Sequence, residues 1–335
     1  MRVKQVFMAL AVGTLVACSG GASPNVSPPG QVLPTDTVPT AGSLPTPMAI
    51  PTTGRILFIV EHDEGSHVLF IDQSGLHDIA TTDPTLAKAN WAPDDTILFD
   101  SERDGGLRHI FRMGSDGQSV VQLTSGPSIQ ERPAISPDGS TIAYSESEGA
   151  FVKSHGLWVA NADGSNPRQL TPDGKPDVDS ADTSPAFSPD GAWIVFERAA
   201  LFTSGQSGLV LIHPDGSGLR RLTDDTLGAG YPRWSPDGKK ILFSQHYDGT
   251  TFMPGPLWIV DVASGKVTAL TDPTDSGIST EGDWSPDGSQ IVYKYFAPGM
   301  DHNELRLVDA DGTHESTFWV PPSGVGGAET PDWGR

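Results

Sequence analysis

The chain contains 335 residues, including 38 Gly and 29 Pro, with a hydrophobic content of 36%. This length allows a sizeable core, but Gly and Pro recur too often for long helices, so the composition favours an all-β protein. The formal net charge of -21 argues against nucleic acids and anionic membrane surfaces as partners, because both carry negative charge and would repel the chain.

The N-terminal segment has the form of a secretory signal peptide. A basic start precedes an apolar run at 6–16, which is shorter than the roughly 20 residues that span a bilayer. The tetrapeptide LVAC at 15–18 resembles the bacterial lipobox, in which signal cleavage leaves an N-terminal cysteine that carries lipid. Cys18 is the single cysteine, which excludes an internal disulfide framework and a cysteine-based zinc cluster. We expect a lipoprotein signal peptide at 1–17 and lipidation of Cys18; an ordinary signal peptide with an incidental cysteine is the alternative.

Residues 18–53 form the next segment, which is rich in Pro, Ser and Thr and has no hydrophobic periodicity. Such a composition cannot bury enough apolar area to offset the entropy cost of ordering. The sequence therefore predicts a disordered tether that spans roughly 30 to 110 Å and keeps the folded part away from the membrane.

A turn motif recurs throughout the remaining segment, residues 54–335. An apolar residue is followed by Ser-Pro-Asp-Gly or a close variant, beginning at Trp91, Ile135, Phe187, Trp234 and Trp284, with a remnant around Trp333. The successive spacings of this apolar residue are 44, 52, 47, 50 and 49 residues. Periods of this length are typical of repeated supersecondary units.

Each unit is expected to contain four short strands. The Ser-Pro-Asp-Gly turn suits a tight reversal, an apolar strand such as 142–144 follows it, the third strand ends at another Gly turn, and the fourth ends in Leu-Thr. Four antiparallel strands repeated six times predict a six-bladed β-propeller. The Ile-Leu-Phe at 56–58 lacks a strand before it and Trp333 lacks strands after it. The C-terminal strand is therefore expected to join the N-terminal blade and close the ring, which removes exposed sheet edges.

These repeats, together with the Pro-Asp-Trp-Gly at 331–334, resemble the WD40-like (PD40) repeats of the TolB family, the periplasmic propeller of the Tol-Pal envelope system. The resemblance covers residues 54–335 and implies a propeller in the cell envelope, outside the cytoplasm. TolB proper resembles a soluble protein with an α/β domain before its propeller, whereas here the tether leads directly into the first blade.

Two sets of residues within the repeats are interpreted as scaffold. The turn aspartates Asp138, Asp190, Asp237 and Asp287 could be taken for a ring of acids, but a turn requires Asp there to bond its own backbone. The tryptophans that open several repeats sit where a strand packs between blades, which favours core packing over ligand stacking.

The irregular loops of all six units are expected on one face, because successive connections of an up-and-down meander alternate between two faces. These loops are rich in Asp and Glu with interspersed aromatic residues. The candidate binding residues on this face, several of them near the central channel, are Glu131, Asp182, Tyr231, His246, Tyr247, Glu281 and Glu329. The pattern predicts an acidic surface that attracts a basic envelope protein or peptide; a merely solvated acidic surface is the alternative.

Enzymatic functions find less support in the sequence. A Gly-x-Ser-x-Gly nucleophile elbow is absent, and His246 and His302 are scattered without the spacing of metal ligands, so neither a metal nor another cofactor is expected. We expect a monomeric, lipid-anchored propeller outside the cytoplasm that binds rather than catalyses, with no nucleic-acid partner. A propeller hydrolase or lyase acting on an envelope glycan or peptide is the alternative.

Overall fold

The computed structural model describes residues 51, 53–62, 65–79, 83, 85–103, 105–147, 155–171, 180–200, 206–245, 255–322 and 326–334. All of them belong to one compact unit within Thr37–Arg335. The predicted signal peptide, Cys18 and nearly all of the predicted tether lie outside the described residues. In the described part of the chain, no helix is long and apolar enough to cross a membrane.

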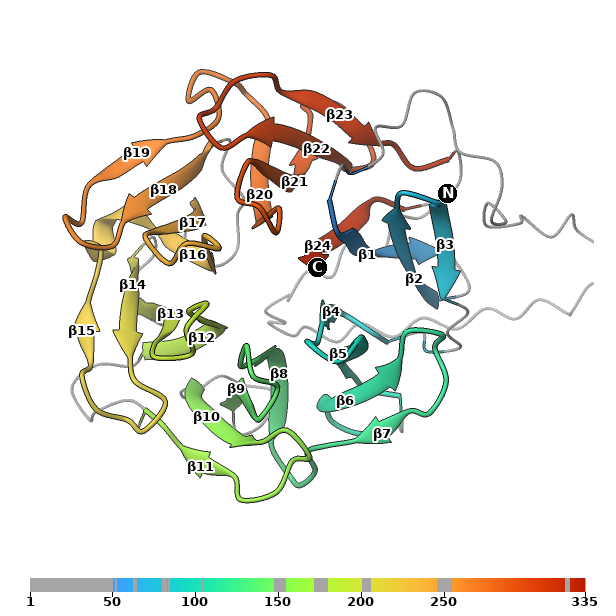
Figure 1. Cartoon of the computed structure of the whole chain (residues 1–335), viewed down its shortest axis with the longest axis vertical. Helices are drawn as coiled ribbons and strands as arrows, with labels where there is room; N and C mark the ends of the chain where they lie inside the picture. The colour runs from blue at the N-terminus through green and yellow to red at the C-terminus, as the bar shows by residue number, and fades with distance from the viewer. Residues whose placement is uncertain are drawn as a thin grey trace, which may run out of the picture. The chain divides into compact units, whose positions relative to one another are not determined.

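The described residues form a six-bladed propeller of four-stranded antiparallel blades, as the sequence predicted (Figure 1). Blade 1 contains β24 (Ala328–Gly334), β1 (Arg55–His62), β2 (Gly65–Asp72) and β3 (Gly75–Ile79). Blade 2 contains β4 (Lys88–Trp91), β5 (Thr96–Ser101), β6 (His109–Gly114) and β7 (Val121–Gln122). Blade 3 contains β8 (Ile129–Ile135), β9 (Thr141–Ser147), β10 (His155–Asn161) and β11 (Arg168–Gln169).

The remaining three blades repeat this order, with the first strand at the ring centre and the fourth at the rim (Figure 1). Blade 4 contains β12 (Ser180–Phe187), β13 (Ile194–Ala200), β14 (Ser207–Ile212) and β15 (Arg220–Arg221). The short helix η1 (Asp225–Leu227) leads into blade 5, which contains β16 (Ala229–Trp234), β17 (Lys240–Gln245), β18 (Leu257–Asp261) and β19 (Val267–Ala269). Blade 6 contains β20 (Ile278–Trp284), β21 (Gln290–Phe296), β22 (Glu304–Asp309) and β23 (Ser316–Trp319).

The ring closes as predicted, because β24 pairs antiparallel with β1 and supplies the innermost strand of blade 1. Ile56 lies opposite Trp333 in this ladder, and the Trp333 indole nitrogen donates to the Thr53 carbonyl oxygen at 2.8 Å. A parallel bridge between His155 and Ala181 additionally joins blades 3 and 4 into one hydrogen-bonded sheet.

Alternation along the second strands places apolar side chains between all neighbouring blades. Because side chains in a strand alternate between faces, Ile142 and Tyr144 of β9 pack against blade 2, while Ala143 packs against blade 4. Equivalent clusters lie at the other interfaces, so the core of the described residues consists of layers between the blades.

The turn aspartates are structural, as interpreted from the sequence. Asp138 Oδ1 accepts hydrogen bonds from the Ser136 hydroxyl at 2.6 Å and the Ser140 amide at 3.0 Å. The same pattern recurs at Asp190, Asp237 and Asp287. Hydrogen bonds from Ser136 and Ser140 lower the pKa of Asp138 to about 2.

The Leu-Thr pairs at the ends of the fourth strands also have a local cause. The Thr171 hydroxyl oxygen accepts from the Leu157 amide at 3.0 Å, which satisfies a donor of the third strand where the two-residue β11 has already ended. Thr124, Thr223 and Thr271 accept in the same way. The side chain therefore replaces backbone pairing at the outer edge of the blade.

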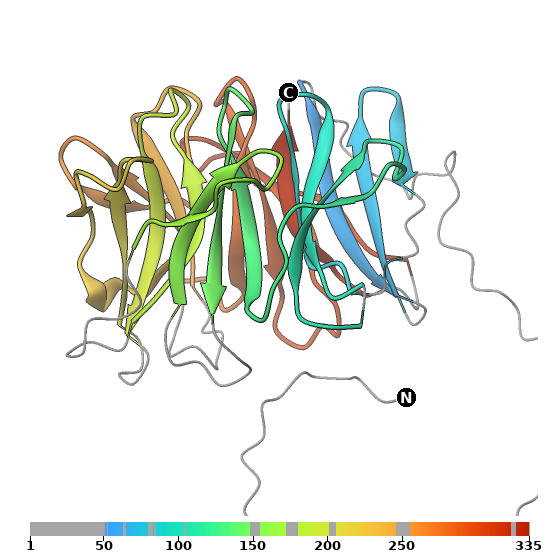
Figure 2. The ribbon, with the colours of Figure 1, turned by 90° about the horizontal axis from the view of Figure 1, so that it is seen from below.

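Two faces of the ring follow from this meander. The turn face carries the Ser-Pro-Asp-Gly turns and the C-terminal end of β24, which lies at the top of Figure 2. The loop face, on the opposite side, carries the connections between blades and those between second and third strands.

Candidate functional site

The innermost strands carry a β-bulge at one repeated position. The residue three before the apolar end of each strand has a positive φ in five blades, at Arg132 (55°), Ser184 (55°), Tyr231 (53°), Glu281 (51°) and Thr330 (48°). The ladder register shifts at each of these points. In β4 the corresponding residue is Lys88, and its ladder with β5 is regular. We call these six residues the bulge ring.

Left-handed backbone in residues other than Gly is costly and persists only where the surroundings impose it. At two of the five positions, a side chain of the neighbouring blade holds the amide of the left-handed residue. The Arg132 amide donates to Asp100 Oδ2 at 2.7 Å, and the Glu281 amide donates to the Ser244 hydroxyl at 2.9 Å. Asp100 and Ser244 occupy the same position, directly after the apolar triad of the second strand, and both are almost fully buried.

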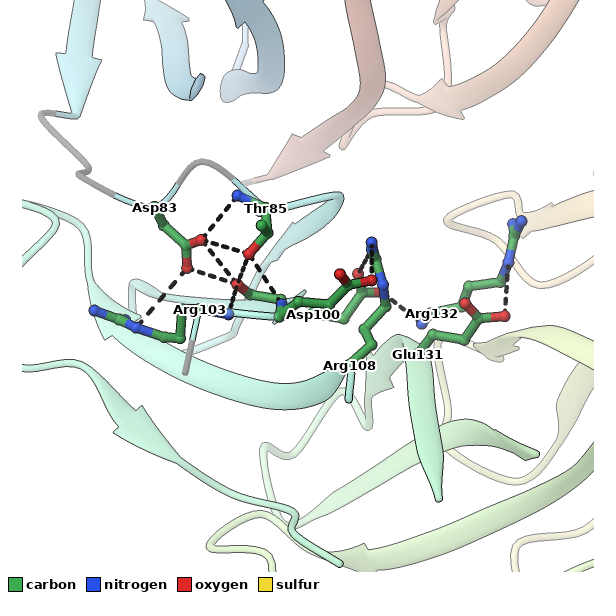
Figure 3. Close-up of polar contacts among 9 residues, drawn as sticks. Asp83, Thr85, Asp100, Arg103, Arg108, Glu131 and Arg132 are labelled. Atoms are coloured by element: carbon green, nitrogen blue, oxygen red, sulfur yellow. Dashed lines mark hydrogen bonds and ion pairs between the residues drawn. The ribbon is translucent and has the colours of Figure 1, made fainter. Parts of the chain in front are cut away.

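Asp100, near the end of β5, also fixes a charged cluster with residues of blades 2 and 3 (Figure 3). Its Oδ1 accepts from Arg108 at 2.8 Å, and Arg108 contacts Glu102 at 3.2 Å. Burial raises the pKa of Asp100, whereas the Arg108 charge and the Arg132 amide oppose this rise. The cluster therefore holds the start of blade 3 against blade 2.

A second group in Figure 3 fixes the segment that leads into β4. Asp83, which is 5% exposed, accepts hydrogen bonds from the Thr85 amide and hydroxyl at 3.0 Å and from the Ser101 hydroxyl at 2.8 Å. Arg103 lies 3.9 Å from the same carboxylate. These contacts fix the approach of the chain to Lys88, the bulge-ring residue of blade 2.

One bulge-ring side chain, Arg132, contacts two others from the next two blades. Arg132 donates to the Ser184 hydroxyl at 3.2 Å and to the Tyr231 hydroxyl at 3.4 Å, and its guanidinium lies 4.8 Å from the Tyr231 ring centroid. These residues come from blades 3, 4 and 5, so their side chains converge on the ring axis. Glu131, with 29% of its side chain exposed, lies 3.9 Å from Arg132.

The opposite part of the ring contains an ion triad in which Lys294 and Glu281 are buried and Glu329 is half-buried. The Lys294 ammonium of β21 lies 3.3 Å from Glu281 Oε1 and 2.5 Å from Glu329 Oε2, and the Asn303 amide donates to Glu329 Oε1 at 2.7 Å. Burial favours the neutral form of Glu281, but the charges of Lys294, Lys88 and Arg132 outweigh it and lower the pKa to about 2. Glu281 therefore stays ionised at neutral pH.

Two residues further toward the turn face, carboxylates connect successive innermost strands. Asp283 Oδ2 accepts from the Trp333 amide at 2.7 Å, and Asp332 Oδ2 accepts from the Trp91 amide at 2.8 Å. Arg233 lies 4.0 Å from Asp283. Burial and the nearby Asp332 charge raise the pKa of Asp283 to about 7, although Arg233 acts in the opposite direction.

The predicted binding residues thus occupy different environments. Glu131, Tyr231, Glu281 and Glu329 lie at the ring centre, where Arg132 or Lys294 contacts each of them. Asp182 is buried in a two-pronged pair with Arg198, at 2.6 and 2.7 Å, and does not contact this group through any of its described hydrogen bonds. His246 and Tyr247 lie outside the described residues.

Exposed carboxylates are present at the loop face as well. Asp224 and Asp272 are exposed before β16 and β20, and each accepts the amide of the residue two positions later. Asp301, in the connection from β21 to β22, has 93% of its side chain exposed and lies 3.0 Å from His302. No group of three His, Cys, Asp or Glu residues suitable for a metal occurs among the residues with described positions.

Sequence reasoning missed the cations at the ring centre and the polar residues behind the bulges. The polar residues behind the bulges do have a sequence signal. A polar residue follows the apolar triad in five second strands, at Asp100, Ser145, Glu197, Ser244 and Lys294. The bulge position is also marked, because Pro or Gly follows it in five innermost strands.

Comparison with known proteins agrees with this architecture. The PD40 family, described as the TolB beta propeller domain, matches residues 36–226 and 153–301. The chain belongs to the TolB β-propeller family. Membership accounts for the six repeats, and the family match continues through β21 of blade 6.

Three relatives of this TolB-family chain show how far the similarity extends. An uncharacterized protein of Agrobacterium fabrum is 28% identical over 261 residues, which are 64% of this chain and 86% of that protein. The Tol-Pal system protein TolB of Francisella tularensis is 25% identical over 260 residues, covering 75% of this chain but only 55% of that protein. The crystal structure of TolB from Acinetobacter baumannii superposes with a TM-score of 0.65 at 21% identity, covering 86% of this chain and 68% of that one.

Proposed function

We propose that this protein is a lipid-anchored propeller outside the cytoplasm that binds a protein with a basic surface through its loop face. Membership of the TolB propeller family and similarity to a Tol-Pal system protein support a location in the cell envelope. The observation that carries the proposed contact is the set of exposed loop-face carboxylates, of which Asp224 and Asp272 have no cation within 4 Å in the described part of the chain.

The anchor is supported by the LVAC tetrapeptide that ends at the single cysteine. We predict that Cys18→Ser abolishes lipid modification and releases the propeller from the membrane without unfolding it. Metabolic labelling with a fatty-acid analogue, followed by membrane fractionation, measures both effects. Equal labelling of the wild type and the variant would rule out the anchor at this position.

The ring-centre residues divide into two roles in this proposal. Glu131 and Glu329 each have 29% of their side chains exposed and can contact a partner at the mouth of the ring. Asp182 and Glu281 are buried and position their surroundings through Arg198 and Lys294. Tyr231, His246 and Tyr247 add aromatic contact area in the proposal, as aromatic residues commonly do at interfaces.

A charge-matched pair of triple variants tests the acidic face. We predict that Asp224→Asn, Asp272→Asn and Asp301→Asn together slow association with the partner and flatten its salt dependence, because exposed charges steer encounter and are screened by salt. Crosslinking in cells identifies the partner, and stopped-flow measurements across a salt series give the association rates.

The control is Asp163→Asn, Asp215→Asn and Asp311→Asn on the turn face. Each of these aspartates accepts the amide two residues later, as Asp224 and Asp272 do, and both triple variants remove three exposed negative charges. If the two triple variants have equal association rates and equal salt dependence, the loop face does not attract the partner. Its carboxylates then form only a solvated acidic surface, and the proposed binding face is refuted.

A further inference from the structure

Lys88 differs from the other cations at the ring centre. Arg132, Arg233 and Lys294 each have a carboxylate within 4.0 Å, at Glu131, Asp283 and the Glu281–Glu329 pair. Among the described residues, no carboxylate lies within this distance of the Lys88 ammonium, and no hydrogen-bond acceptor contacts it. A partly buried ammonium without a partner costs free energy, so this position favours an added anion.

The bulge ring supplies a second donor on the innermost strand of the blade next to that of Lys88. Thr330 occupies the corresponding position on β24, the innermost strand next to β4, and its buried hydroxyl has no partner among the described residues. Side chains at this level on neighbouring blades do reach one another, since Arg132 contacts the Ser184 hydroxyl at 3.2 Å. An ammonium and a hydroxyl at one level suit the two oxygen atoms of a carboxylate.

Charges on the surrounding strands define the kind of anion. Arg132 on β8 and Arg233 on β16 add positive potential around Lys88, whereas Glu281 on β20 and Asp332 on β24 add negative potential. One added negative charge is balanced by Lys88, but a second one would be repelled by Glu281 and Asp332. Solvent reaches this level of the ring, where 33% of the Arg132 side chain is exposed.

We propose that the ring centre binds a small monoanionic carboxylate, with the Lys88 ammonium and the Thr330 hydroxyl as its hydrogen-bond donors. This site does not use the exposed loop-face carboxylates that carry the proposed protein contact. It requires neither Asp224, Asp272 nor Asp301.

Binding should depend on pH in a defined direction. Burial lowers the pKa of Lys88 to about 7, and the charges of Arg233 and Arg132 act in the same direction. The charges of Glu281 and Asp332 act in the opposite direction and raise this pKa. The charged fraction of Lys88 then falls about tenfold between pH 6 and pH 8. Asp283, with its pKa raised to about 7, gains negative charge over the same interval. Both changes weaken anion binding as the pH rises.

Acetate is a suitable probe, observed by NMR of the purified full-length protein labelled with ¹³C at the lysine Cε. Titration at pH 6.5 and constant ionic strength should shift the Lys88 resonance saturably, with a dissociation constant in the millimolar range. Phosphate should bind more weakly than acetate. Lys88→Met and Thr330→Val should each weaken acetate binding about tenfold or more, the loss typical of a charge-assisted hydrogen bond.

Lys266→Met serves as the control, because Lys266 is exposed at the turn face and its loss should leave acetate binding unchanged. Weaker binding at pH 8, together with the losses in both site variants, supports the site. If Lys88→Met does not fold, the acetate titrations of the wild type and of Thr330→Val, followed at the Lys88 resonance, still test the site. A Lys88 resonance that responds equally to chloride and acetate, or identical binding by wild type and Thr330→Val, overturns the proposal.

Discussion

Deletion of residues 328–335 should abolish the cooperative thermal unfolding of the propeller. The deletion removes β24, leaves β1 as an open edge and takes Trp333 out of the layer between blades 6 and 1. Loss of one buried Trp side chain alone costs about 3–5 kcal/mol, and net stabilities of native proteins are about 5–15 kcal/mol. Circular dichroism during heating, with sedimentation to detect association through the open edge, measures the effect.

A substitution in an outermost strand serves as the control for the deletion of the innermost strand β24. Replacement of Val121 and Gln122 by Gly alters the two-residue outer strand β7, in which both residues are exposed. The free energy of unfolding of this variant should fall by only about 1 kcal/mol, because Gly at exposed strand positions destabilises a protein only slightly. A truncated protein that melts within about 2 °C of the full chain would contradict closure by β24.

Lys294→Met should destabilise the propeller by about 3–5 kcal/mol, because it leaves Glu281 and Glu329 as adjacent carboxylates without their shared cation. The melting temperature should fall by roughly 6–10 °C for a domain of this size. Chemical denaturation monitored by tryptophan fluorescence gives the free energy of unfolding directly.

The charge-neutral triple variant separates charge from packing. Lys294→Met combined with Glu281→Gln and Glu329→Gln removes all three charges and should recover most of the lost stability. Lys240→Met, an exposed lysine of β17, should change the free energy of unfolding by less than about 0.5 kcal/mol. A Lys294→Met variant as stable as Lys240→Met would show that the triad contributes nothing.

The triad also predicts an acid limit. The pKa of Glu281 is lowered in the folded state, so its contribution is present above the ordinary pKa of glutamate and is lost as the pH falls through about 2. The turn aspartates act in the same direction, since the pKa of Asp138 is lowered to about 2. Wild-type stability should therefore fall between about pH 4 and pH 2.

The fold was predictable because its determinants are local. Each turn with its Asp, each Ile-x-aromatic triad and each Leu-Thr pair can be recognised within a few residues, and their period gives the number of blades. Closure was predictable as well, because Trp333 repeats the position of Trp284 without strands to follow it.

The ring centre was less predictable because its contacts join distant residues. Arg132 meets Tyr231 across 99 residues, and Lys294 meets Glu329 across 35. Counting carboxylates in loops identified Glu281 and Glu329 but could not show that one lysine on a second strand contacts both. The sign and size of the local charge depend on such pairings, which sequence spacing does not reveal.

Closure by β24 has a consequence for biosynthesis. Ile56 pairs with Trp333, so blade 1 cannot acquire its innermost strand until residue 333 has been synthesised. At about 5–20 residues per second, the ribosome needs roughly 14–55 s to add the intervening segment. The nascent chain therefore carries an unfinished sheet for most of its synthesis and completes the ring only afterwards. Until then the inner edge of β1 stays unpaired, so the protection that closure gives to this edge arrives only at the end of synthesis.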